Sequence, residues 1–349
     1  MLNVAVAGLV CVDLRPELDE SARFAPGRLI EVGPLSMRLG GLVGNTGIDL
    51  LDLNVPLRFE CGVGADELGT YVRDTLQSRG ADISGIRSVP DESTSYSLIL
   101  EPRGVDRTIW HSIGANARFD GREVTTEGID ILHVGYPALL PSIVADGGEP
   151  LETLLSRSRA AGVTTSVDLS YIDSGSATAH LDWHAILTRM ARHADVLSPS
   201  LDDLTSALRI DEPFSTALVD RMLIELLDWG VAVAAISAGE HGLFLRTAGA
   251  ERLRAAGRAL TQHAETWADR DLHLPPVWNE IPVTTNGAGD ATSAGLLFGL
   301  AIGAGPIESA QLAAACSGAL VSGRRTTVEV ISEMCPDLVD LLSRSNEGR

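Results

Sequence analysis

The stretch VTTNGAGDATSAGLLFGLAIG, residues 283–303, places a β-branched run, a glycine-bearing turn and a single carboxylate directly before a helical pattern of small residues. It predicts a strand, a turn and a helix in that order. In open α/β sheets, ligands bind at the carboxyl ends of strands, where the unpaired N–H groups of a following helix attract anions. Gly287, Ala288 and Gly289 leave these N–H groups unobstructed. We therefore expect an anion site here, bordered by Asp290.

A carboxylate at position 290 would repel a phosphate bound at those amides, so the presence of Asp290 needs an explanation. Two interpretations are possible. It can cap the helix, which is a common role for an acid at a helix start. It can also be a general base that accepts the proton of a substrate hydroxyl, while the bare amides stabilise charge on a transferring phosphoryl group. The stretch alone leaves both interpretations open.

Hydrophobic runs alternate with helical patterns along the chain. Such alternation is typical of an α/β fold with a mostly parallel central sheet and helices on both faces. The predicted strands are Val4–Gly8, Ile131–Gly135, Thr164–Asp168, Val196–Ser198, Val231–Ser237 and Leu243–Arg246. The predicted helices are Gly44–Leu53, Glu67–Arg79, Leu151–Ala161, Ala185–His193 and Ser215–Trp229.

Two segments interrupt this alternation and predict a small β layer beside the main sheet. Leu14–Leu39 is loop- and strand-like, and Ser95–Ser112 reads as a hairpin with Pro-Arg-Gly at its turn. We interpret them as a lid, formed by about residues 14–39 and 95–112, on a single domain that spans residues 1–349. Residues 247–280 are expected to form an insertion with a partly helical centre, and the final RSNEGR a frayed tail.

Composition and charge exclude several classes of protein. The net charge of −20 argues against a nucleic-acid-binding face, which needs clustered basic residues. No run approaches the roughly 18 apolar residues of a spanning helix, and the N-terminus reads as a strand rather than a signal peptide. We therefore expect no membrane contact and a cytoplasmic location. The four cysteines lack metal-site spacing and are expected to be small buried hydrophobic residues.

The chain contains no lysine, so all 27 residues counted as lysine plus arginine are arginine. This excludes a phosphate loop of the G-x-x-x-x-G-K-[ST] type, a Schiff-base lysine and the strand lysine of protein kinases. If the protein handles phosphate, we expect backbone amides and arginine to bind it.

Three further motifs accompany the Gly-Ala-Gly-Asp segment. GGLVGN at residues 40–45 sets a double glycine before a helix, GLVCVD at 8–13 ends the first strand with an acid, and ISAGEHG at 236–242 carries two glycines after a strand. In this order and at these distances they resemble the ribokinase-like, or PfkB, carbohydrate kinase family, with its G-G-x-x-x-N and D-T-x-G-A-G-D segments. The resemblance extends from Val4 to about Arg325 and implies a ribokinase-like fold.

The resemblance implies a role for each matching position. Asp290 would be the catalytic base that deprotonates the acceptor hydroxyl, and Gly287, Ala288 and Gly289 would form the anion hole. Sugar hydroxyls would be held by Asp13, Gly40, Gly41 and Asn45, and the nucleotide by Ser237, Gly239 and Gly242. The family uses ATP with Mg²⁺, which would explain how phosphate is handled without lysine.

The sequence departs from the family pattern at two places. Thr284 replaces the first acid of the C-terminal motif, which helps to form a monovalent-cation site in many members, so Thr284 weakens the expectation of such a cation. Ser200 and Asp203 stand where the family has N-x-x-E, which acts on magnesium through water. Asp203 could reach a metal-bound water or be an ordinary acid in the first turn of a helix, and Asp202 is a competing candidate.

The lid carries side chains for a substrate or a partner. Arg103 and Arg107 could clamp the carboxylate or phosphate of an acidic sugar, or serve only solubility. Tyr96 and Trp110 could stack on a sugar ring or base, or pack in an interface. Because lid strands in this family often pair across a dimer and exposed edges need cover, we expect a homodimer through the lid strands.

The predicted function is an ATP-dependent kinase acting on a hydroxyl of a sugar, sugar acid or nucleoside, with sugar preferred from the resemblance. Asp290 would take the proton during in-line transfer while the lid excludes water. The alternative is a non-catalytic small-molecule-binding or regulatory protein on the same fold, suggested by Thr284, Ser200 and Asp203. The intact Gly-Ala-Gly-Asp segment, together with Asp13 and Asn45, favours the kinase.

Overall fold

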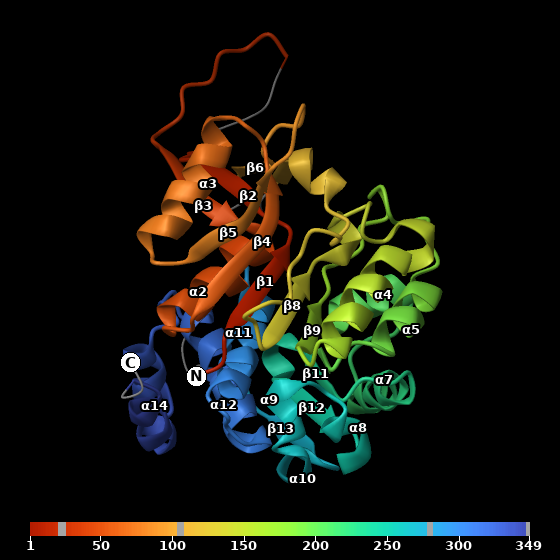
Figure 1. Cartoon of the computed structure of the whole chain (residues 1–349). Coiled ribbons are helices and arrows are strands. Elements are labelled where there is room, and N and C mark those ends of the chain that lie inside the picture. The colour runs from red at the N-terminus through yellow and green to blue at the C-terminus, as the bar shows by residue number, and fades with distance from the viewer. Residues whose placement is uncertain (20–25, 103–107, 278–281, 347–349) are drawn as a thin grey trace.

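The computed structural model describes residues 1–19, 26–102, 108–277 and 282–346, and a central sheet runs through most of it (Figure 1). In these ranges the sheet has nine strands in the order β13-β12-β11-β10-β9-β8-β1-β4-β5. All neighbours are parallel except β11–β12 and β12–β13, so the prediction of a mostly parallel sheet is confirmed. The strands are β1 Val4–Gly8, β4 Leu57–Val63, β5 Asp82–Ser88, β8 Ile131–Gly135, β9 Thr164–Asp168, β10 Val196–Leu197, β11 Val233–Ser237, β12 Leu243–Thr247 and β13 Asp271–Leu274.

Helices cover both faces of this sheet, because its strands are apolar on both sides. Along β1, Val4 and Val6 pack into one buried cluster, whereas Ala5 and Ala7 pack into another. The first cluster includes side chains of α2, α3, α11 and α12, and the second those of α4, α5, α6 and α7. In Figure 1, α2, α11 and α12 lie to the left of β8 and β9, whereas α4, α5 and α7 lie to their right. The helices are α1 Gly41–Gly44, α2 Thr46–Asp52, α3 Glu67–Ser78, α4 Ala145–Ala160, α5 Trp183–Ala191, α6 Leu201–Leu208, α7 Thr216–Asp228, α8 Ala250–Arg254, α9 Arg258–Thr261, α10 Ala264–Trp267, α11 Ala288–Ala301, α12 Pro306–Val321, α13 Val328–Met334 and α14 Val339–Asn346, with short 3₁₀ turns η1 Gly114–Arg118, η2 Pro137–Leu139, η3 Gly239–His241 and η4 Pro336–Leu338.

The two segments that we interpret as a lid build a separate small sheet in the order β3-β2-β6-β7, so the predicted small β layer is confirmed. The register places Asp13, Ser97 and His111 on one face, which borders the large cavity described below. Leu14 and Leu98 point to the opposite face. The strands are β2 Cys11–Pro16, β3 Leu35–Gly40, β6 Tyr96–Leu100 and β7 Thr108–Ser112.

Some local predictions were wrong. The β-branched residues before the glycine turn do not form a strand, since the N–H groups of Val283 and Thr284 both donate to the carbonyl of Val321 at the end of α12. The helix predicted over Gly44–Leu53 is divided into α1 and α2 at Asn45, whose backbone is not helical (φ −99°, ψ −83°). Strands β4 and β5 were not predicted.

Residues 247–280 have the partly helical centre that the sequence predicts, in the form of α8, α9 and α10. The same segment also supplies β13, which pairs with β12 and forms an edge of the main sheet. The C-terminal RSNEGR was expected to be a frayed tail, but α14 includes its first three residues and ends at Asn346. No helix in the part of the chain that the structure describes is both long enough and apolar enough to span a bilayer.

Candidate active site

The carboxylate of Asp290, in the first turn of α11, accepts hydrogen bonds from three side chains of other elements. Thr46 Oγ1 donates to Oδ1 at 2.9 Å, while Asn45 Nδ2 at 3.0 Å and Tyr136 Oη at 2.6 Å donate to Oδ2. The N-cap position of α11 is Gly287, with no side-chain cap. Burial raises the pKa of Asp290 to about 6, against the lowering effect of these three donors. Asp290 therefore does not cap its helix, which favours the interpretation as a base.

Two elements bring the donors to Asp290. Asn45 and Thr46 stand at the start of α2, which packs against α11. Tyr136 follows β8 in a left-handed conformation (φ 59°, ψ 47°), which is uncommon for a residue other than glycine. Burial and the charges of Asp290 and Asp168 raise the pKa of Tyr136, so its hydroxyl stays protonated and acts as a donor.

A second buried carboxylate, Asp168, lies at the carboxyl end of β9. Its Oδ1 accepts from the N–H of Leu169 at 2.8 Å, and its Oδ2 accepts from Ser293 Oγ at 3.2 Å. Burial, followed by the charges of Asp290 and Asp203, raises the pKa of Asp168. Since all three carboxylates line the same cavity, a bound cation would offset their mutual repulsion.

Asp203 has a structural role. The N–H of Asp203 donates to Ser200 Oγ at 3.1 Å, and the N–H of Ser200 donates to Asp203 Oδ2 at 2.9 Å, which forms a capping box at the start of α6. The helix-start interpretation is thus confirmed, yet Asp203 also lines the cavity together with Asp202 and Asp168.

These carboxylates fit a magnesium ion held through water. Among the described residues, no three His, Cys, Asp or Glu side chains are grouped closely enough to hold a metal directly. Mg²⁺ keeps several waters and takes only one or two carboxylates, so the oxygen atoms of Asp168 and Asp203 suit it.

The predicted anion site has backbone amides at the start of α11. No arginine is found among the described residues that line the cavity. Gly287 adopts φ +84°, which glycine allows at no steric cost, and turns the chain into α11. The first-turn N–H groups of Gly289 and Asp290 have no acceptor within the helix. A Cβ built on Gly289 would meet nothing within 4 Å, so the space beside these amides is open.

On the lid side, a small polar cluster faces the same cavity. Cys11 Sγ donates to Asp13 Oδ1 at 3.6 Å, and Ser97 Oγ lies 3.1 Å from His111 Nδ1. Gly40 makes room for Asp13, since a Cβ there would come within 2.6 Å of Oδ1. Burial raises the pKa of Asp13 and lowers that of His111, which favours a neutral imidazole. Such groups suit hydroxyl ligands.

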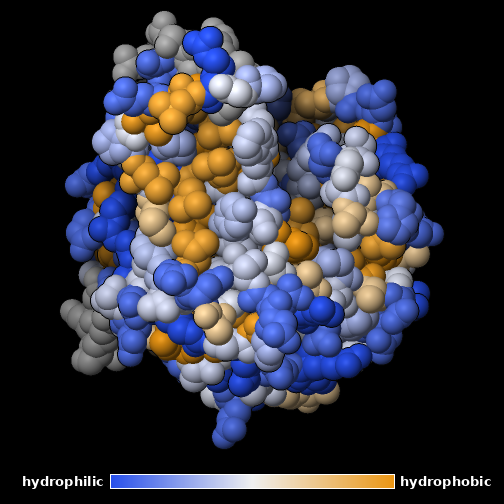
Figure 2. Space-filling view, turned by 90° about the horizontal axis from the view of Figure 1, so that it is seen from above, coloured by the Kyte–Doolittle hydropathy of each residue, from blue (hydrophilic) through white to orange (hydrophobic). Residues whose placement is uncertain are grey.

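One cavity of about 1120 Å³ brings most of the predicted site residues together, and the surface seen from above is hollowed (Figure 2). Gly40 lies directly against Asp13. Arg107, like Arg103, lies outside the described residues. The predicted residues that line the cavity are Asp13, Gly41, Asn45, Asp203, Ser237, Gly239, Gly242, Gly287, Ala288, Gly289 and Asp290.

Sequence reasoning missed five residues of this site: Thr46, Ser97, His111, Tyr136 and Asp168. Tyr136 and Asp168 could have been found, because each stands at the carboxyl end of a correctly predicted parallel strand, where ligands bind. Ser97 and His111 share a face with Asp13 only through the lid register, which the sequence does not reveal.

A family model described as pfkB family carbohydrate kinase matches residues 1–332. The bifunctional protein HldE of Geobacter metallireducens is 24% identical over 345 residues; the match covers 95% of this chain but 63% of that protein, so the chain spans less than two thirds of this relative. A fructokinase of Rhizobium leguminosarum bv. trifolii is 28% identical over 269 residues, 75% of this chain and 71% of that one. The solved structure of an Arabidopsis thaliana ribokinase with ribose and ATP has the same fold, with a TM-score of 0.72 at 17% identity and 98% of both chains covered.

Proposed function

The chain belongs to the pfkB family of carbohydrate kinases, and we propose that it transfers the γ-phosphoryl group of ATP to a hydroxyl of a neutral sugar. The observation that carries the proposal is the buried carboxylate of Asp290, which three donors hold beside the open amides at the start of α11. Phosphoryl transfer to a hydroxyl requires a base for the proton and an anion site for the phosphoryl oxygens, and this arrangement offers both.

In the proposed reaction, Asp290 accepts the hydroxyl proton as the sugar oxygen attacks the γ-phosphorus of ATP in line, and the bond from that phosphorus to the bridging oxygen breaks so that ADP leaves. A pKa of about 6 leaves the carboxylate ionised at neutral pH and makes it a better proton acceptor than an exposed aspartate. The N–H groups of Gly289 and Asp290 would stabilise the transferring oxygens. Bound Mg²⁺ supplies neutralisation of the phosphate charge, and Asp168 and Asp203 would hold its waters.

The charge of the cavity supports a neutral sugar over an acidic one. Its described lining has seven carboxylates, one histidine and no arginine. An anionic sugar would meet this negative charge without a cationic partner among those residues, whereas sugar hydroxyls can donate to Asp13 and interact with Ser97 and His111.

We also propose a homodimer that forms through the lids. The face of the lid that carries Leu35 and Met37 is apolar, and these side chains are 56% and 37% exposed. The view from above shows apolar side chains gathered on the surface (Figure 2). A second copy of the same face would cover them.

The test is ADP release from ATP and Mg²⁺ across neutral sugars, sugar acids, sugar phosphates and nucleosides, each with and without potassium. We expect turnover of a neutral sugar, independent of potassium because of Thr284. Asp290→Asn should lose about 10²–10⁴-fold in turnover while calorimetry still detects sugar binding, and the exposed control Asp220→Asn should match the wild type.

Two outcomes would contradict the proposal. Turnover confined to sugar acids or phosphates would refute the neutral substrate. Sugar binding without turnover of any compound would favour the alternative, a non-catalytic binding or regulatory protein.

A further inference from the structure

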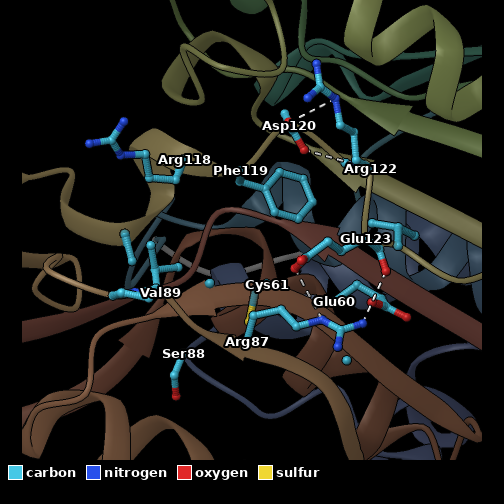
Figure 3. A pocket seen from close by; sticks show the side chains of 16 residues that line it. Glu60, Cys61, Arg87, Ser88, Val89, Arg118, Phe119, Asp120, Arg122 and Glu123 are labelled. Atoms are coloured by element: carbon cyan, nitrogen blue, oxygen red, sulfur yellow. Dashed lines mark hydrogen bonds and ion pairs between the residues drawn. The ribbon is translucent and has the colours of Figure 1, made fainter.

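A second cavity, of about 450 Å³, shares no lining residue with the active-site cavity. It lies between one face of β4 and β5 and the segment 115–124 (Figure 3). Five residues of its lining belong to the two connections that lead from β5 to β6 and away from β7, namely Val89, Pro90, Ala115, Arg118 and Phe119. The cavity is therefore at the base of the lid hairpin.

Two glycines in the floor of this cavity make room for neighbouring side chains. The strand register opposes Glu60 to Gly85 and Gly62 to Arg87, so these four residues share one face of the sheet. A Cβ at Gly85 would come within 2.5 Å of the Glu60 carboxyl carbon, and one at Gly62 would lie 3.0 Å from Val89. Glycine at position 85 thus leaves room for the Glu60 carboxyl group, and glycine at position 62 leaves room for Val89.

The floor presents a buried carboxylate whose charge is already balanced. Glu60 is 2% exposed, and its Oε1 lies 3.0 Å from Arg58 Nε and accepts from Thr125 Oγ1 at 3.4 Å. Its Oε2 is directed over Gly85. Because Arg58 offsets the charge, the carboxylate suits neutral donors such as hydroxyls better than an ammonium group.

Arginines surround the cavity in a protein of net charge −20. Arg87, Arg118 and Arg122 line it, and Arg87 lies near Glu123 with Nε 3.6 Å from the carboxylate (Figure 3). The other two pair with Glu92 and Asp120 at 2.8 and 3.3 Å. Exposed pairs of this kind contribute little to stability, so a bound anion can displace them.

We propose that this cavity binds a small sugar phosphate, with its phosphate on Arg87 and its hydroxyls donating to Glu60. The ring of Phe119, which points into the cavity, packs against the apolar face of the sugar (Figure 3). The volume suits a ligand of this size.

The position of the site couples it to the lid. The N–H of Ala115 donates to the carbonyl of Ser93 at 2.8 Å, which joins the connection after β7 to the one before β6. Gly114 lies at this crossing with φ +48°, and a Cβ there would come within 2.2 Å of the Ser93 oxygen. A ligand that orders these connections is expected to change the KM for the sugar. This coupling rests on the proposed kinase function, whereas binding itself does not.

The test is isothermal titration with glucose 6-phosphate and ribose 5-phosphate, beside glucose, inorganic phosphate and AMP. We expect saturable binding of a sugar phosphate that weakens at least tenfold in Arg87→Gln. Arg221→Gln, which removes an exposed arginine paired with Glu212, should bind as the wild type does. Asp13→Asn, in the active-site cavity, should also retain binding. Thermal unfolding verifies that each variant is folded.

Four results would overturn the proposal. Neither sugar phosphate binds, Arg87→Gln binds as tightly as the wild type, or Asp13→Asn abolishes binding and so assigns the ligand to the active site. Equal or tighter binding of inorganic phosphate or AMP would mean that the cavity binds a free anion or a nucleotide and not a sugar phosphate. A failed kinase assay affects none of these, because titration needs no turnover.

Discussion

At the scale of the residue, the strength of Asp290 as the proposed base should depend on the hydroxyl of Tyr136. Burial raises the pKa of Asp290 to about 6, and the bond from Tyr136 is the first of those that lower it. In Tyr136→Phe this donor is lost, so the pKa of Asp290 should rise further. Because the ionised form is the base, the acid limb of kcat/KM against pH should move to higher pH, with about a tenfold loss of activity near pH 6 and a smaller loss at pH 8.

A matched control separates the shift in the pKa of Asp290 from the general effect of removing a tyrosine hydroxyl group. Tyr71 donates its hydroxyl to the carbonyl of Met37 at 3.0 Å, so Tyr71→Phe removes a hydroxyl bond that does not involve Asp290. The two pH profiles are measured side by side. An unshifted acid limb in Tyr136→Phe, or an equal shift in Tyr71→Phe, would contradict the assignment.

The residues of the site were predictable where a motif marks them. Asp290 and the glycines before it follow from one stretch of sequence, but that stretch could not decide between a cap and a base. The decision depends on donors about 150 and 245 positions away in the chain, at Tyr136 and Asn45. Tyr136 reaches Asp290 from a left-handed backbone conformation that no local pattern predicts for a tyrosine.

At the scale of the element, α3 is joined to the lid connection by its own N-cap. Asp66 accepts from the N–H of Gly69 at 2.8 Å and from the N–H and hydroxyl of Thr94 at 2.7 and 2.5 Å. Asp66→Ala loses the cap and leaves the buried Thr94 without these acceptors, so it should lower the free energy of unfolding by about 2–3 kcal/mol.

Urea denaturation measures this loss, and Asp182→Ala is the control. Asp182 caps α5 by accepting from the N–H of Ala185 at 3.1 Å. Asp182→Ala should therefore lower the free energy of unfolding by only about 1 kcal/mol. Equal losses in the two variants would show that the bonds to Thr94 contribute nothing beyond the cap.

The elements that the sequence predicted best are short apolar strands between turn residues. Val4–Gly8, Ile131–Gly135 and Thr164–Asp168 have the predicted bounds, because each is buried along its whole length. The edge strand β5, Asp82–Ser88, was missed because only Gly85 and Ile86 are buried in it, which leaves no alternation to detect. Val283–Thr285 shows the opposite failure: its residues favour a strand, but its N–H groups bond to a helix end.

At the scale of the whole molecule, the lid should set the oligomeric state. Leu35 is 56% exposed on the apolar face of the lid, so Leu35→Asp would place a charge in the proposed interface. Sedimentation equilibrium should show a dimer for the wild type and a monomer for this variant. Ile224→Asp, on α7 with 50% of its side chain exposed, should remain a dimer. A monomeric wild type would refute the lid dimer.

The stability of the whole molecule should fall as pH rises from acidic to neutral, because its buried carboxylates ionise at a cost. Asp49, on α2, accepts from Thr326 Oγ1 at 2.7 Å through Oδ1, while its buried Oδ2 has no partner among the described residues. Burial raises the pKa of Asp49 to about 7, against about 3.9 in the unfolded chain. The folded state therefore binds more protons between these values, and this contribution, complete below about pH 4, is lost as pH rises through 7.

Asp49→Asn keeps an acceptor for Thr326 and removes the titration. The wild type should lose about 1–3 kcal/mol more of its unfolding free energy than this variant between pH 5.5 and 8, measured by urea denaturation at intervals across that range. Repulsion among the other acids of a chain with net charge −20 adds a slope common to both proteins, so the difference between the two slopes is the informative quantity. The exposed variant Asp220→Asn should keep the slope of the wild type. Parallel slopes for the wild type and Asp49→Asn would mean that Asp49 is ionised in the folded protein at little cost in free energy. The polar surroundings of α2 would then have to stabilise the charge of Asp49, because the hydrogen bond from Thr326 does not account for it.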